Sequence, residues 1–161
     1  MKKSLRTALY FTGGIAVSLI LLNRLTSSYP WSMFPIFGVL WWPLSAYFAG
    51  RHEPLHYAVY GTALIDALFL LTYLFSSPGA HPWFLYPMMG VFWWPLSVWG
   101  SMVGAKRFSV TATLYIALML LVINLITSYG NWWWFYPAVP VLWWPAALYI
   151  KDRTGKEGEA E

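Results

Sequence analysis

The segment from His52 to His56 matches the H-E-x-x-H pattern, which on a helix places two zinc-binding imidazoles on one face with a glutamate as general base. Pro54 opposes this arrangement, because the residue before a proline is pushed out of the helical conformation and proline favours the first helical position. We therefore expect a helix to begin at Pro54 and His52 to lie outside it. The match is interpreted as chance, and neither a metal site nor an enzymatic activity is predicted.

Asp66 is the only carboxylate within the long apolar stretches of the chain. A charged group inside a membrane is costly, so such a residue is a functional candidate by default. Two interpretations stay open: an ionisable group that serves a proton, a cation or a ligand, and a neutral side chain that is hydrogen-bonded to a tryptophan or threonine. The sequence has no cysteine, no glycine-rich phosphate loop and no serine nucleophile motif, so it supports no other catalytic chemistry.

The composition is typical of an integral membrane protein. Of the 161 residues, 59% are hydrophobic and only 10% are charged, whereas a soluble domain has roughly a quarter of its residues charged. A helix needs about 20 apolar residues to cross a bilayer. We expect an all-α fold with six transmembrane helices, at Thr7–Leu25, Trp31–Ala49, Leu55–Phe75, Pro82–Val103, Phe108–Ser128 and Trp132–Ile150.

The basic residues predict the orientation of these helices. Of the ten Lys and Arg residues, only Arg24 falls in a connection on the outer side; the others lie at the N-terminus, in the inner connections or in the charged tail from Lys151 to Glu161. Short basic loops stay on the cytoplasmic side, so both termini are expected there. The net charge of +4 is then a topology signal, and no continuous basic surface predicts binding to nucleic acid.

A threefold internal repeat organises the chain. Copies of W-x-x-[FY]-P-x-x-[GP]-V-x-W-W-P begin at Trp31, Trp83 and Trp133, so the repeating unit has about 50 residues. Each unit is expected to be a helical hairpin, and an even number of spans per unit makes the three hairpins parallel. We predict one membrane domain with units at about 1–50, 51–104 and 105–150 and a cytoplasmic tail at 151–161. A ring and a row of hairpins are both compatible with the sequence.

The second helix of each hairpin carries paired tryptophans about 15 Å beyond its start, near the middle of the bilayer. Their indole N–H groups need acceptors there. Proline inside a helix frees the carbonyl four residues earlier. Kinks are therefore predicted at Pro35, Pro43, Pro87, Pro95, Pro137 and Pro145, which would free the carbonyls of Trp31, Val39, Trp83, Val91, Trp133 and Val141.

These features together define the predicted binding residues. The indole N–H groups are expected to donate to the freed carbonyls or to polar groups on the first helices, namely Asn23, Thr26, Asp66, Thr72, Asn124 and Thr127. The residues predicted to bind a ligand or partner are Trp41, Trp42, Trp93, Trp94, Trp143, Trp144 and Asp66.

Two segments of the middle unit resemble the 2TM domain family, a two-helix bacterial membrane module that is also found attached to sensor histidine kinases. Leu55-His56-Tyr57-Ala58-Val59-Tyr60 is similar to the start of that family's first helix, and Trp83-Phe84-Leu85-Tyr86-Pro87 is similar to the entry to its second helix. The resemblance, taken three times along the chain, implies a bacterial inner-membrane module and no defined activity.

For function, the sequence favours a non-enzymatic subunit that acts in sensing, as an accessory or in assembly. Its tryptophan- and proline-rich helices would bind a membrane protein, a second copy of the chain, or a flat apolar ligand such as a quinone, porphyrin or carotenoid, because such pockets are mostly apolar. No cofactor is required by the sequence. The alternative is a small transporter or channel with Asp66 as its ionisable group, since interrupted helices at equivalent places of repeats are typical of transport sites.

Overall fold

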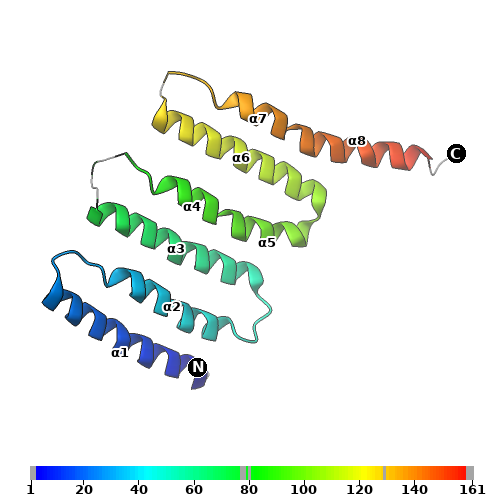
Figure 1. Cartoon of the computed structure of the whole chain (residues 1–161). Helices are drawn as coiled ribbons and strands as arrows, with labels where there is room; N and C mark the ends of the chain where they lie inside the picture. The colour runs from blue at the N-terminus through cyan, green and yellow to red at the C-terminus, as the bar shows by residue number, and fades with distance from the viewer. Residues whose placement is uncertain (1–2, 77–78, 80, 129, 159–161) are drawn as a thin grey trace. The chain divides into compact units, whose positions relative to one another are not determined.

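The computed structural model is built of helices and has no strand among the residues that it describes, which are 3–76, 79, 81–128 and 130–158, with side chains to residue 152. The all-α prediction is therefore confirmed for this part of the chain. Figure 1 shows the helices in chain order: α1 (Lys3–Thr26), α2 (Met33–Phe48), α3 (Pro54–Ser76), α4 (Leu85–Val91), α5 (Trp93–Val103), α6 (Ala105–Thr127), α7 (Phe135–Val141) and α8 (Trp143–Gly158).

Three of these helices, α1, α3 and α6, are long and apolar enough to cross a membrane. The chain thus has the features of a membrane protein. Helix α2 is apolar but has only 16 residues. The remaining two stretches that we predicted as single spans are each divided, at Phe92 into α4 and α5 and at Leu142 into α7 and α8.

The chain forms two compact units, which are described separately: an N-terminal unit at residues 1–95 and a C-terminal unit at residues 96–161. In the N-terminal unit, helices that follow one another in the chain pack together, α1 on α2, α2 on α3 and α3 on α4. In the C-terminal unit, α6 packs on both α7 and α8. Each long helix is therefore followed by a shorter helix, or a pair, that packs back against it.

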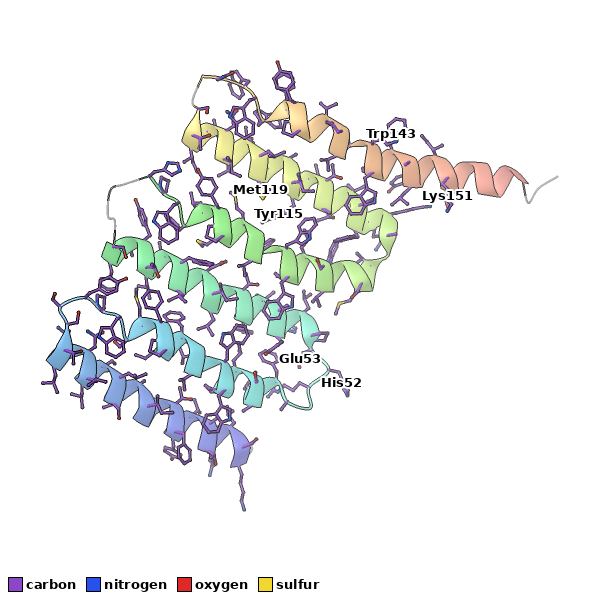
Figure 2. All side chains as sticks on the ribbon, in the orientation of Figure 1. His52, Glu53, Tyr115, Met119, Trp143 and Lys151 are labelled. Carbon is purple, nitrogen blue, oxygen red and sulfur yellow. The ribbon has the colours of Figure 1, made fainter. Side chains whose placement is uncertain are left out.

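Small and polar residues make these contacts possible. The buried residues of the long helices include pairs four residues apart, Ala8 and Thr12 in α1, Ala58 and Thr62 in α3, and Ser109 and Thr113 in α6. Small side chains let two helix backbones approach closely, which is how helices associate in lipid. Large apolar side chains point outward along the same helices, as the sticks in Figure 2 illustrate.

Two glycines shape the connections between successive hairpins. Gly50, after α2, has a φ of 75°, and Gly104, between α5 and α6, has a φ of 83°. Residues with a Cβ rarely adopt this left-handed conformation, so glycine allows the chain to reverse direction within a few residues.

Candidate functional site

The second tryptophan of each pair packs against the long helix that precedes it. Trp42 stacks on Phe11 with a centroid distance of 5.9 Å. Trp94 lies edge-on to Tyr57 at 5.7 Å, and Trp144 lies edge-on to Phe108 at the same distance. Since Tyr57 and Phe108 directly precede the buried Ala58 and Ser109, these two contacts occur at the same register of the repeat. The second tryptophan holds the two helices of a hairpin together.

The first tryptophan of the first pair has a different role. Trp41 packs on α3 of the next hairpin, where its ring lies 6.2 Å from Tyr57. The same ring lies 6.1 Å from Trp94 of α5. Gly61 lies beneath both indoles, because a Cβ at this position would be 2.5 Å from a Trp94 ring atom and 2.8 Å from a Trp41 ring atom. Two predicted binding residues thus meet over one glycine that the sequence reasoning had not singled out.

The equivalent tryptophan of the third pair is exposed. Trp143 has 70% of its surface accessible, although its neighbour Trp144 contacts Phe108. Trp42 and Trp93 are partly exposed. Within the N-terminal unit, Trp41 and Trp94 thus come together, and within the C-terminal unit Trp144 contacts Phe108 while Trp143 is exposed.

The predicted kinks at the first proline of each repeat are wrong. Pro35, Pro87 and Pro137 each occupy the third position of a helix, in α2, α4 and α7. Backbone N–H groups of a first turn have no partner within the helix, so proline removes no hydrogen bond there. The carbonyls of Trp31, Trp83 and Trp133 are not freed either; they accept from the backbone N–H groups of Phe34, Tyr86 and Tyr136.

In two repeats, the second proline lies just after an interruption of the helix. Pro95 and Pro145 occupy the third positions of α5 and α8, which begin directly after the interruptions at Phe92 and Leu142. Pro43, in contrast, lies within the continuous helix α2.

The carbonyl of Val141, which Pro145 deprives of a backbone donor, accepts from the hydroxyl of Thr113 on α6 at 3.4 Å. For Val141 the donor is therefore a threonine of the neighbouring helix and not the tryptophan that we predicted. Thr12 and Thr62 occupy the same register of α1 and α3, and within the described residues their buried hydroxyls have no hydrogen-bond partner. The sequence signal was the recurrence of Ala or Ser four residues before Thr.

The other polar groups that we expected to accept from tryptophans are engaged elsewhere. Asn23 donates to the carbonyls of Ser27 and Tyr29 and accepts from the backbone N–H of Ser32 at 2.7 Å. Asn124 donates to the carbonyl of Asn131 at 2.6 Å. Both asparagines thus close the turn that follows their helix. The three threonines donate to carbonyls four residues earlier in their own helices; they are Thr26, Thr72 and Thr127.

Asp66 lies in the middle of α3 and is partly buried. Its Oδ1 atom is buried and has no hydrogen-bond partner among the described residues.

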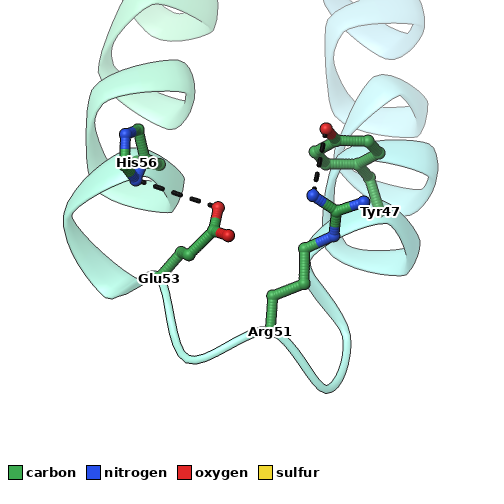
Figure 3. A network of polar contacts seen from close by, with 4 residues as sticks. All are labelled: Tyr47, Arg51, Glu53 and His56. Carbon is green, nitrogen blue, oxygen red and sulfur yellow. Dashed lines mark hydrogen bonds and ion pairs between the residues drawn. The ribbon is translucent and has the colours of Figure 1, made fainter.

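The segment that matches the zinc-protease pattern forms a connection and a helix start, shown in Figure 3. Helix α3 begins at Pro54, which confirms that His52 lies outside it. Glu53 lies 3.8 Å from Nδ1 of His56, while Arg51 donates to the Tyr47 hydroxyl at 3.1 Å and covers its ring. In the described part of the chain, no group of three His, Asp or Glu residues is placed to hold a metal ion.

No family model matches the chain, and no curated protein or solved structure is significantly similar to it.

Proposed function

We propose that the chain crosses a bacterial inner membrane six times, as three parallel hairpins with both termini in the cytoplasm. The helical lengths support this proposal. Helix α2, with 16 residues, is about 24 Å long, and the stretch from Leu85 to Val103 covers about 28 Å, against about 30 Å of hydrocarbon. The resemblance to the 2TM domain family and the one-sided distribution of basic residues favour the same topology.

Within this topology, we propose a non-enzymatic subunit for sensing, accessory function or assembly. The observation that carries the proposal is the exposure of Trp143, at 70%, where the equivalent Trp41 is packed against the helix of a neighbouring hairpin. An aromatic surface that repeats an internal packing surface, but is exposed in the described C-terminal unit, is suited to bind a membrane protein or a flat apolar ligand.

The experiment is native mass spectrometry of the protein in a mild detergent, with an absorption spectrum of the same sample. We expect wild-type protein to retain a partner subunit or an apolar molecule and Trp143→Ala to lose it. Trp132→Ala is the matched control, because Trp132 is also exposed but precedes α7. A bare monomer for wild type, or equal loss from both variants, would contradict the proposal.

A small transporter or channel is the second candidate, because Oδ1 of Asp66 is buried without a partner in the described structure. A buried, unpaired carboxylate oxygen within a span is a place for a proton or a cation. Proton or cation flux into liposomes that disappears in Asp66→Asn, with unchanged thermal stability, would establish this function. If instead Asp66→Asn abolishes folding, the residue is structural.

A further inference from the structure

The packing of α2 on α3 provides a template for a second contact. A partly open space of about 190 Å³ lies between the two helices, lined by Phe34, Phe37, Gly38 and Trp41 of α2 and by Leu64, Ile65 and Leu68 of α3. Trp41 of this α2 face packs on α3, where its ring lies 6.2 Å from Tyr57 and over Gly61.

Helix α1 has the equivalent face, and it is open. When Thr12 is aligned with Thr62, Gly14, Ile15 and Ser18 of α1 align with α3. Their counterparts there are Leu64, Ile65 and Leu68. Where α3 has α2 packed on this face, α1 has an open groove of about 490 Å³, lined by Tyr10, Phe11, Gly14, Ile15, Ser18, Leu19 and Leu22. All seven residues belong to α1, so no other helix of the described structure fills this groove.

The last hairpin has the complementary face. The repeat aligns Tyr136, Val139, Pro140 and Trp143 with the four α2 residues of the template. Three of them are strongly exposed, Tyr136 at 68%, Val139 at 58% and Trp143 at 70%. Like the groove on α1, this face has no charged side chain, so both can lie within the bilayer.

We propose that the face of α7 and α8 formed by Tyr136, Val139, Pro140 and Trp143 docks in the α1 groove of a second copy, as α2 packs on α3. This inference rests on the proposed membrane topology and names the partner. All hairpins are expected to be parallel. In two copies in one membrane, α7 and α8 of one copy can therefore meet α1 of the other in the same relative orientation as α2 meets α3. The contact is heterologous, so it generates closed rings or open rows of copies.

One difference between the two faces defines where the ring of Trp143 fits. Gly61, which accommodates Trp41, corresponds to Phe11 in α1. The room for an indole ring on α1 therefore lies about one helical turn further along, because α1 has Gly14 and Ser18 where α3 has Leu64 and Leu68. A Cβ at Gly14 would meet no atom within 4 Å. Two small residues four positions apart are typical of helix contacts in lipid.

The test uses single cysteines, since the chain has none of its own. A Ser18→Cys copy and a Tyr136→Cys copy, with different tags, are co-expressed and treated in membranes with a short bismaleimide. We expect a cross-linked dimer that carries both tags, and none from either variant alone. Val17→Cys paired with Tyr136→Cys is the matched control, because Val17 is exposed but does not line the groove.

A variant that blocks the groove provides a second readout. Gly14→Trp is expected to lower cross-linking between Ser18→Cys and Tyr136→Cys copies at least tenfold, whereas Gly13→Trp is expected to leave it unchanged. Neither glycine has an atom within 4 Å of its Cβ position, so both variants are expected to fold, which thermal unfolding checks.

Three results would overturn the inference. One is the absence of cross-linked dimers, which would mean that lipid covers both faces. Another is cross-linking only within one chain in a variant that carries both Ser18→Cys and Tyr136→Cys. This result would mean that α7 and α8 of the same copy fill the α1 groove. The third is equal cross-linking of the Val17→Cys control. If native mass spectrometry still finds another partner or an apolar ligand, the proposed function stands without this inference.

Discussion

At the scale of residues, Gly61 determines how closely Trp41 and Trp94 approach α3. Any Cβ at this position would lie within 2.8 Å of both indoles, and both rings also contact Tyr57. We expect Gly61→Ala to destabilise the protein by about 1–3 kcal/mol, as overpacking of a filled core does. Thermal unfolding in detergent measures this change.

The control for Gly61→Ala is Gly13→Ala, at a position where a Cβ meets nothing within 4 Å. Alanine is a better helix former than glycine by about 0.5–1 kcal/mol, so unchanged or raised stability is expected. Equal effects of the two substitutions would show that the indoles do not pack on Gly61.

Thr113 replaces the backbone donor that Pro145 removes from the carbonyl of Val141. We expect Thr113→Val to cost about 0.5–1.5 kcal/mol, the usual net value of one hydrogen bond. In Pro145→Ala, the backbone N–H of residue 145 can donate to the same carbonyl, so the cost of Thr113→Val is expected to disappear in this background. The double-mutant cycle isolates this coupling, and additive effects would contradict it.

At the scale of elements, an asparagine in the last turn of α1 and of α6 holds the turn that follows the helix. Asn23 makes three hydrogen bonds to the turn that leads into α2. We expect Asn23→Ala to cost about 1–3 kcal/mol, because buried backbone groups lose their partners. Ser28→Ala, in the same turn but exposed, is expected to have little effect on the thermal unfolding temperature.

The helices themselves were largely predictable, because apolar length and proline position are local properties. The start of α3 at Pro54 followed from one residue. Prolines in a first helical turn were not distinguished from prolines inside a helix. Pro35 and Pro43 can be assigned to these two classes only when the helix start at Met33 is known. Sequence reasoning placed the starts of α2, α4 and α7 at the aromatic belt, two or three residues too early, and this misplaced the freed carbonyls.

The contacts of the tryptophans were harder to predict. Alignment of the repeats indicated six equivalent indoles in three pairs, but equivalence in sequence does not give equivalence in packing. Trp41 has a neighbouring helix with glycine at the contact, whereas Trp143 is exposed in the described structure. The missed Thr12, Thr62 and Thr113 lie in the first helices, where the repeat is weaker and was not aligned.

At the scale of the whole molecule, the proposed account depends on each hairpin crossing the membrane twice. If α2 and the divided helices lay along the membrane surface, the paired tryptophans would not reach its middle, and the α1 groove would face no equivalent helix of a second copy. The topology is therefore the central claim.

Single cysteines in the connections test it most directly. Ser28→Cys, His81→Cys and Asn131→Cys lie in the three turns expected outside, and Glu53→Cys and Arg107→Cys lie in or beside the two inner connections. With a membrane-impermeant maleimide on spheroplasts, we expect the first three to be labelled and the last two to be labelled only after lysis. Labelling of Glu53→Cys or Arg107→Cys in intact spheroplasts, or protection of any of the three outer positions, would contradict the six-span account.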